Sequence, residues 1–174
     1  KKKKITIDED EKIKSQFLMM RKILIKNNYK NYEISNFSKL NYESLHNLGY
    51  WNGKKYLGVG PSSHSYDGKS RQWNIKNNNK YIIAMQGKKI CFQEEILTKK
   101  NIINEYILTG LRTNQGVSLH KLDKNMNTGQ RTNLIEYIKI FEKKGLIKIQ
   151  KNRFFLTEQG MLFCDKITSE LFLL

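Results

Sequence analysis

A long segment in the first half of the chain, residues 38–80, has no sustained apolar period and limits the choice of fold more than any other feature. It is rich in glycine, asparagine, serine and aromatic residues. A stretch of roughly forty such residues inside a compact protein is usually functional or packed against a ligand. We therefore expect regular elements on either side of it and the candidate chemistry within it.

Before this segment the sequence predicts one α/β unit. Acidic residues 8–11 begin a helical pattern, where the helix dipole favours negative charge. Apolar residues at helical spacing predict one apolar face, made of Ile13, Phe17, Met20 and Leu24. The helix ends near residues 27–28, and residues 32–37 predict a short strand.

After the segment the sequence predicts the order helix, helix, hairpin, helix. Apolar spacing places the helices near 102–111, where the first stops near Gly110, and 134–141, and the hairpin strands at 146–149 and 154–156. Thr157 is expected to cap a last helix that reaches towards Leu171. This order is typical of a winged-helix module.

The charge of the chain is strongly positive, with 32 Lys and Arg against 16 Asp and Glu, or +16. Only five of the basic residues are arginine, and the chain is also rich in asparagine and isoleucine. A/T-rich codons encode lysine, asparagine and isoleucine, whereas proteins that read phosphates or bases tend to use arginine. The charge therefore favours compositional bias over a dedicated nucleic-acid surface.

The composition also narrows the protein class. With 39% hydrophobic and 11% aromatic residues, the chain can bury a core. No apolar run approaches the roughly 20 residues that span a bilayer, and no apolar region follows Lys1–Lys4 as in a signal peptide. Cys91 and Cys164 are too far apart in sequence for a disulfide scaffold or a close-spaced metal motif, so we expect the reducing cytoplasm.

The hexapeptide His46–Trp51 is the densest candidate for chemistry. An imidazole can ligate iron, and Tyr50 or Trp51 beside it can lie flat on a planar aromatic ligand. The residues alone leave a structural role open, in which His46 hydrogen-bonds a loop carbonyl and the two aromatic rings fill core. For an arbitrary sequence this structural role is the more frequent one.

Other candidates are weaker. Gly58 and Gly60 permit close backbone approach to a ligand, but a tight turn at Pro61 explains them equally well. Arg71 can bind a carboxylate or pair with an acid of the fold. Glu105 and Arg112 share one helix face and are expected to be structural.

Taken together in order and spacing, these segments resemble one family. The motifs are Tyr32-Glu33-Ile34-Ser35-Asn36-Phe37, His46-Asn47-x-x-Tyr50-Trp51, Tyr56-Leu57-Gly58-x-Gly60-Pro61-Ser62-x-His64-Ser65, Arg71-Gln72-Trp73-Asn74 and Asn104-Glu105-Tyr106-Ile107-x-Thr109-Gly110-Leu111-Arg112-Thr113. They resemble the HemW family of bacterial heme chaperones, relatives of oxygen-independent coproporphyrinogen III oxidase among the radical SAM enzymes. The resemblance continues through residues 145–147 and 156–160 and covers nearly the whole chain.

The resemblance implies that the chain is the C-terminal half of such a protein. The family begins with a partial (β/α) barrel whose Cys-x3-Cys-x2-Cys loop binds a 4Fe-4S cluster and S-adenosylmethionine, and this sequence lacks that motif. We therefore expect a fold of the class α/β plus α. Residues 1–95 would form the end of the radical SAM partial (β/α) barrel and carry the heme-motif loop. Residues 96–174 would form a mostly helical, winged-helix-like domain. The sequence departs from the family at 38–41, where Ala-Lys-Pro-Gly is usual, and at Ser63, where alanine is usual.

The resemblance also implies the site residues. The family motif His-Asn-x-x-Tyr-Trp binds heme and corresponds to His46, Asn47, Tyr50 and Trp51. His46 would give an axial nitrogen to heme iron, Asn47 would fix its tautomer, and the two aromatic rings would shield the porphyrin. Further residues expected near the cofactor are Asn36, Gly58, Gly60, His64 and Arg71, with Lys54, Lys55 or Arg71 facing the propionates.

The function implied first is a cytoplasmic heme chaperone that passes heme to acceptor proteins, among them proteins at the membrane surface. The alternative is coproporphyrinogen oxidation in porphyrin biosynthesis, although no catalytic residue or cluster ligand is assigned to this chain. A lesser alternative is a winged-helix nucleic-acid binder. Against it, Glu136 and Glu142 interrupt the lysines of the candidate recognition stretch 131–144, and we expect no specific nucleic acid partner.

Overall fold

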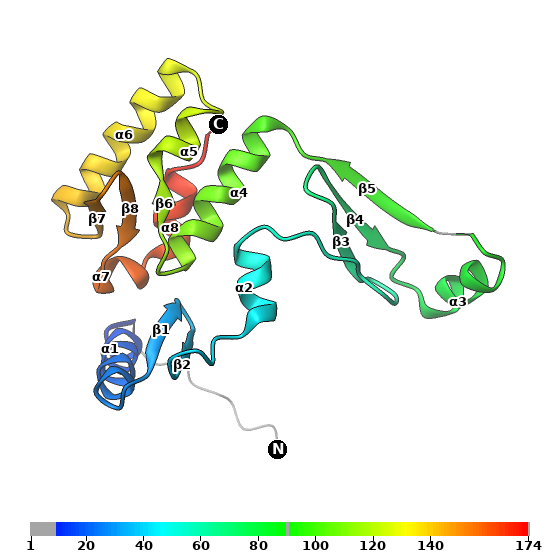
Figure 1. Ribbon diagram of the computed structural model, residues 1–174, viewed down its shortest axis with the longest axis horizontal. Coiled ribbons are helices and arrows are strands. Elements are labelled where there is room, and N and C mark those ends of the chain that lie inside the picture. Colours follow the sequence, from blue (N-terminus) through cyan, green and yellow to red (C-terminus); the bar gives the residue numbers. More distant parts are fainter. Residues whose placement is uncertain (1–9, 90, 174) are drawn as a thin grey trace.

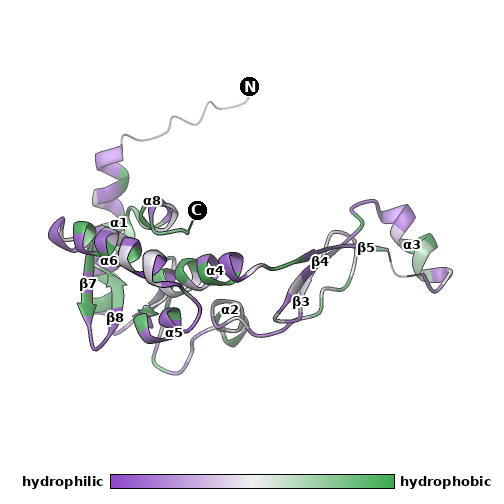
Figure 2. Cartoon of the chain, turned by 90° about the horizontal axis from the view of Figure 1, so that it is seen from above, coloured by the Kyte–Doolittle hydropathy of each residue, from purple (hydrophilic) through white to green (hydrophobic). Residues whose placement is uncertain are grey.

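The computed structural model describes residues 10–89 and 91–173, so the predicted acids at positions 8 and 9 lie outside the described residues. Figure 1 shows helices and two small sheets gathered on one side, and a three-stranded sheet that extends away from them with α3 at its far end. Figure 2 shows the same extended arm from a perpendicular direction. Within the described residues, none of the helices combines the length and apolar character that a membrane crossing requires.

The predicted N-terminal helix is confirmed as α1 (Asp10–Lys26), with Asp10 and Glu11 in its first turn. Its apolar face forms but is not buried: Ile13 and Met20 are 45% and 42% exposed, and no residue of the helix is buried. The described part of the chain therefore leaves this face largely uncovered.

The predicted strand 32–37 is wrong, because the chain reverses within it. β1 (Lys30–Glu33) and β2 (Asn36–Ser38) pair antiparallel around a turn at residues 34–35. The carboxylate of Glu33 accepts the backbone N–H of Ser35 at 2.9 Å, and the N–H of Ile34 donates to the carbonyl of Arg112 at 2.9 Å. A side-chain cap and a long-range bond thus hold a turn that the apolar pattern does not predict.

Regular elements form within the segment without a period, residues 38–80, and directly after it. They are α2 (Leu45–Trp51), β3 (His64–Tyr66), β4 (Ser70–Asn74), α3 (Asn78–Gln86) and β5 (Phe92–Ile96). The three strands form one antiparallel sheet in the order β3-β4-β5, which is the arm of Figure 1. Every residue of β5 is exposed, so this strand lacks the alternation by which half-buried strands are recognised.

The second half forms a compact unit around a third antiparallel sheet. Its elements are α4 (Lys99–Arg112), β6 (Val117–Ser118), α5 (Leu119–Asp123), α6 (Thr128–Lys143), β7 (Ile147–Gln150), β8 (Arg153–Leu156), α7 (Glu158–Met161) and α8 (Cys164–Glu170). The two long helices and the β7–β8 hairpin confirm the prediction, and β6 completes the sheet in the order β6-β8-β7. Lys151 and Asn152 both have positive φ, as a two-residue hairpin turn requires.

The first helix ends at Arg112, close to the predicted stop near Gly110. A Cβ at Gly110 would lie 2.6 Å from the Val117 side chain, so this glycine permits close packing against β6. Thr157 caps a helix as predicted, accepting the N–H of Gly160 at 3.0 Å, but the predicted last helix is divided into α7 and α8.

The hydrophobic core lies in this C-terminal unit. Ile107 of α4, Ile138 of α6 and Phe154 of β8 are fully buried, and the remaining core residues come mainly from the same elements. The arm buries few apolar side chains, and α3 at its end exposes Ile82, Ile83 and Met85. The hexapeptide 46–51 therefore lies outside the core of this well-packed unit.

Candidate functional site

The predicted heme motif lies on α2, between the C-terminal unit and the arm (Figure 1). Ser44 caps this helix by accepting the backbone N–H of Asn47 at 3.3 Å. Residues four apart share a helix face, so His46 lies beside Tyr50 and Asn47 lies beside Trp51. His46 and Tyr50 are exposed, whereas Asn47 and Trp51 are half-buried. The helix thus presents an imidazole and a phenol to the surface and keeps the indole partly covered.

His46 begins a row of four rings that leads from α2 to the arm. Its imidazole lies edge-on to Tyr50, with centroids 4.8 Å apart, and Tyr50 lies edge-on to Tyr56 at 4.7 Å. Tyr56 in turn is 6.1 Å from Tyr66 on β3, and the backbones of these two tyrosines exchange two hydrogen bonds of 2.9 Å. We call His46, Tyr50, Tyr56 and Tyr66 the aromatic row. Such offset and edge-on contacts fix ring orientation, so the row holds α2 against β3.

Arg71 of β4 lies at the far end of the aromatic row. It pairs with Tyr66 across the strands, its guanidinium carbon is 6.0 Å from that ring, and its Nη2 is 3.0 Å from Oε1 of Glu105 on α4. The predicted pairing of Arg71 with an acid of the fold is therefore confirmed. Burial raises the pKa of the Glu105 carboxyl, and the positive charge of Arg71 opposes this shift. The pKa of the Tyr66 hydroxyl is also raised, mainly by burial and to a smaller extent by the negative charge of Glu105.

Arg112, near the end of α4, contacts the covered side of the motif helix. Its guanidinium carbon is 5.6 Å from the centre of the Trp51 ring, which is a cation–π contact. Its Nη1 donates to Oδ1 of Asp165 at 2.7 Å. Glu105 and Arg112 were expected to be structural, and each forms an ion pair with another element of the fold. Glu105 pairs with Arg71, and Arg112 pairs with Asp165.

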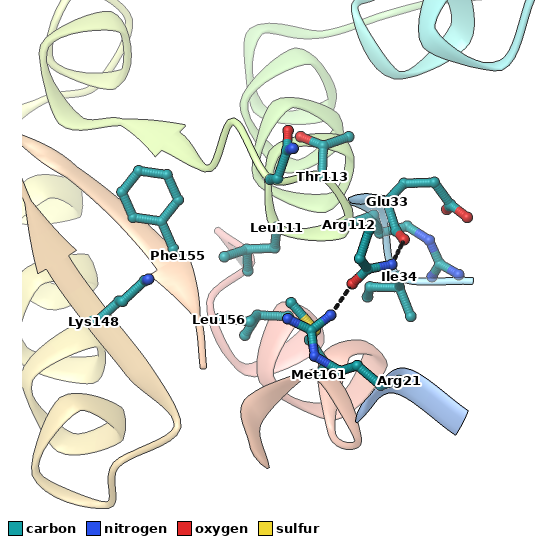
Figure 3. A pocket seen from close by; sticks show the side chains of 12 residues that line it. Arg21, Glu33, Ile34, Leu111, Arg112, Thr113, Lys148, Phe155, Leu156 and Met161 are labelled. Atoms are coloured by element: carbon teal, nitrogen blue, oxygen red, sulfur yellow. Dashed lines mark hydrogen bonds between the residues drawn. The ribbon is translucent and has the colours of Figure 1, made fainter. Parts of the chain in front are cut away.

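A cavity beside Arg112 lies between α1, β1, α4 and the β7–β8 hairpin (Figure 3). Its lining is mixed: Arg21 and Lys148 are basic, Glu33 is acidic, and Phe155 and Met161 are apolar. Arg21 is already held by Glu158 at 3.1 Å and by the side chain of Asn31. None of the predicted site residues lines this cavity, so it adjoins the motif only through Arg112.

The two glycines of the second cluster have different structural roles. A Cβ on Gly58 would lie 2.2 Å from the carbonyl oxygen of His64, and the Gly58 N–H donates to Ser65 Oγ at 3.0 Å. The close approach that Gly58 permits is therefore an approach to β3 of the same chain. Gly60 has a φ of 104°, which favours glycine, and stands immediately before Pro61.

The other predicted residues lie apart from the aromatic row. The His64 ring is 6.0 Å from Trp73 on β4, and Asn36 lies on β2, where its carbonyl accepts the Asn31 amide at 3.1 Å. Across residues 10–89 and 91–173, no group of three His, Cys, Asp or Glu side chains could hold a metal ion. Heme iron is a different case, because the porphyrin supplies four nitrogens and the protein needs to add only an axial ligand. The exposed His46 imidazole fits that requirement.

Sequence reasoning missed the roles of Tyr56, Tyr66 and Arg112 at this site. The strand period could have placed Tyr66 on the same face of β3 as His64, but only with the strand itself recognised. No local signal links Arg112 to Trp51, because the contact joins elements far apart in the sequence.

Comparison with known proteins shows which family model and which relatives the sequence matches. Residues 97–163 match the family model of the HemN C-terminal domain. The heme chaperone HemW of Bacillus subtilis is 35% identical over 138 residues, covering 78% of this chain and 36% of that protein. HemW of Buchnera aphidicola subsp. Schizaphis graminum is 33% identical over 171 residues, covering 95% of this chain and 44% of that protein.

A solved structure shares the fold. Coproporphyrinogen III oxidase (HemN) of Escherichia coli, a radical SAM enzyme, has a TM-score of 0.68 at 14% identity, covering 88% of this chain and 39% of that one. The chain thus spans 36% and 44% of the two HemW relatives, less than half of either. The chain is similar to the C-terminal part of the HemW heme chaperones, and its residues 97–163 match the HemN C-terminal domain.

Proposed function

We propose that the chain binds heme through α2 and passes it to heme-acceptor proteins. The observation that carries this proposal is the pairing of an exposed His46 imidazole with the exposed Tyr50 ring one turn along the same helix. An exposed imidazole can give a nitrogen to iron, and an aromatic ring beside it can cover part of a planar ligand. The names of the HemW relatives support heme as the cargo.

Each residue of the motif has a distinct proposed role. His46 is the axial ligand, Asn47 orients it, Tyr50 covers the porphyrin face, and Trp51 joins the helix to α4. Arg71, 43% exposed at the end of the aromatic row, is the proposed partner for a propionate. Gly58, Gly60, His64 and Asn36 shape the surrounding loops and strands.

A surface-exposed ligand suits a carrier. Heme held at one open axial position by a half-exposed helix can be released without unfolding the carrier, and an acceptor with a deeper pocket would withdraw it. We propose acceptors in the cytoplasm, including proteins at the membrane surface. The 4Fe-4S cluster and S-adenosylmethionine belong, in this proposal, to the additional length of the relatives.

We also propose a division of the chain near residues 95–96. Residues 1–95 would complete a radical SAM barrel in the longer relatives, and residues 96–174 would form a winged-helix-like domain. The order α4, β6, α5, α6, β7, β8 and the sheet β6-β8-β7 support the second part. The family match over 97–163 begins close to this boundary.

The alternative function is a part in coproporphyrinogen oxidation, which the fold shared with HemN of E. coli favours. Both functions involve a tetrapyrrole with carboxylate side chains, so the ligand distinguishes them. Heme contains iron and calls for an axial ligand such as His46, whereas a metal-free porphyrinogen does not.

Titration with ferric heme, followed by transfer, tests the proposal. We expect the 174-residue chain to shift the heme Soret band with saturation near one equivalent, and apomyoglobin added afterwards to recover the heme. Preference for metal-free coproporphyrin, with no Soret change on adding heme, would favour the alternative. Heme that binds but cannot be transferred would contradict the chaperone role.

A further inference from the structure

Two buried hydrogen-bond donors without a partner lie at the contact between the motif helix and α4. Among the described residues, four buried side-chain atoms have no hydrogen-bond partner: Ser38 Oγ, Trp51 Nε1, Arg71 Nε and Arg112 Nε. Three of these are N–H groups that can only donate, since neither indole nor guanidinium can accept a hydrogen bond. Buried donors without an acceptor are rare and call for an explanation. An acceptor that binds at this place would supply one.

Two of the three donors belong to a single contact. Arg112 Nε is bonded to the guanidinium carbon that lies 5.6 Å from the centre of the Trp51 ring, and Nε1 is part of that ring. Arg112 uses Nη1 for Asp165 at 2.7 Å, which holds the guanidinium in place and leaves Nε without a partner. Two unpaired donors, one of them charged, therefore belong to the same contact between α2 and α4.

The chemistry of this donor pair selects the ligand class. A guanidinium edge binds a carboxylate in a planar, charge-assisted geometry, and an indole N–H can donate to the same group. The side chain of Arg112 is 26% exposed and borders the cavity of Figure 3. The Arg112 Nε and Trp51 Nε1 atoms are themselves buried, so a carboxylate that enters from this cavity reaches them only when the two side chains move apart. The row of rings that begins at His46 runs from the same helix.

We propose that Arg112 Nε–H and Trp51 Nε1–H bind one propionate carboxylate of the porphyrin cargo. This inference rests on the proposed heme binding and adds a specificity determinant: the α2–α4 junction recognises the acid group while His46 binds the iron. Trp51 then acts through its N–H as well as through its ring. A porphyrin without free carboxylates would lose this interaction and keep the axial bond.

Comparison of two ligands on the same protein tests the inference without any substitution. Ferric protoporphyrin IX and its dimethyl ester differ only in the acid groups. We expect the wild-type chain to bind the diacid about tenfold or more tightly, as the loss of a charge-assisted hydrogen bond implies, while both ligands shift the Soret band. Equal affinity for diacid and diester would overturn the inference and the proposed propionate role of Arg71, and would leave heme binding through His46 standing. Binding of neither ligand would overturn both.

Two substitutions with matched controls assign the preference to these residues. Trp51→Phe keeps an aromatic ring and removes the N–H, and Arg112→Gln removes the charge; each should reduce the preference for the diacid at least threefold. The controls are Trp73→Phe, whose N–H is already paired with Gln93 at 2.6 Å, and Arg131→Gln, whose guanidinium pairs with Asp123 at 2.6 Å. Both controls should keep the full preference.

The chain has two tryptophans, so Trp73→Phe also makes Trp51 the sole indole fluorophore. In that variant the diacid should change the emission maximum of Trp51, because its N–H gains a carboxylate partner, and the diester should not. Thermal melting of each variant shows whether it is folded. A folded Trp51→Phe or Arg112→Gln protein that keeps the full diacid preference would contradict the inference.

Discussion

The imidazole of His46 stands edge-on to the ring of Tyr50, with centroids 4.8 Å apart and an angle of 89° between the ring planes. Both residues are exposed and lie one turn apart on α2, whose start is fixed by the Ser44 cap. The pairing holds the imidazole at the surface, where a planar ligand could reach its nitrogen and cover the neighbouring ring.

Removal of the Tyr50 ring should weaken heme binding without abolishing it. Aromatic contacts contribute about 0.5–1.5 kcal/mol, so Tyr50→Ala should reduce heme affinity by roughly two- to tenfold. Tyr42→Ala is the matched control, because Tyr42 is 80% exposed and lies outside the aromatic row. Affinity can be measured by Soret titration. Equal losses in the two variants would assign the effect to general damage.

Gly58 should be structurally required, whereas Gly49 of the motif helix should not. A Cβ on Gly58 would meet the His64 backbone at 2.2 Å, while a Cβ on Gly49 would meet only the end of Lys54 at 3.8 Å. We expect Gly58→Ala to lower the free energy of unfolding by about 1–3 kcal/mol through overpacking. Gly49→Ala, inside α2, should be neutral or stabilise by up to about 1 kcal/mol. Urea denaturation of both variants checks the contrast, and an unharmed Gly58→Ala protein would disprove it.

How far the sequence predicts this fold depends on where the stabilising contacts are. The C-terminal unit is predictable because Ile107 and Ile138 lie on periodic helix faces and a polar turn separates β7 from β8. The turn at 34–35 is not, because Glu33 and the distant Arg112 carbonyl hold it. The same limit applies at the candidate site: the hexapeptide marks His46 and Tyr50, but the contact of Trp51 with Arg112 appears only when α2 and α4 are placed together.

The two cysteines should differ sharply in reactivity. Cys91 is exposed, whereas Cys164 is 5% exposed and burial raises the pKa of its thiol above the ordinary value of 9.0. We expect one thiol to react quickly with a disulfide reagent near pH 8 and the second only on unfolding. In a Cys91→Ser variant the fast phase should vanish; a fast phase that persists would contradict the burial of Cys164.

Because the pKa of Cys164 is raised, the stability of the fold should decrease at alkaline pH. The fold favours the neutral thiol, so this contribution to stability is complete below the ordinary thiol pKa and is lost as the pH rises through the raised value. Urea denaturation of the wild type and Cys164→Ala on both sides of pH 9 should show a steeper alkaline loss in the wild type.

Nucleic-acid binding should be weak and non-specific if the charge of +16 is compositional. Counterion release would then dominate, and affinity for duplex DNA should fall by roughly three orders of magnitude between about 50 and about 200 mM salt. Titration with duplexes of unrelated sequence measures this. A large preference for one sequence near physiological salt would favour the nucleic-acid alternative.

The central claim, that His46 is the axial heme ligand, is tested most directly by the heme absorption spectrum of His46→Ala beside that of His64→Ala. Both histidines are exposed and lie in the same segment, so general damage should affect both variants. With folding checked by thermal melting, we predict a displaced Soret band and weaker heme retention in His46→Ala, and a nearly unchanged spectrum in His64→Ala. A folded His46→Ala protein with the wild-type spectrum and affinity would contradict the claim.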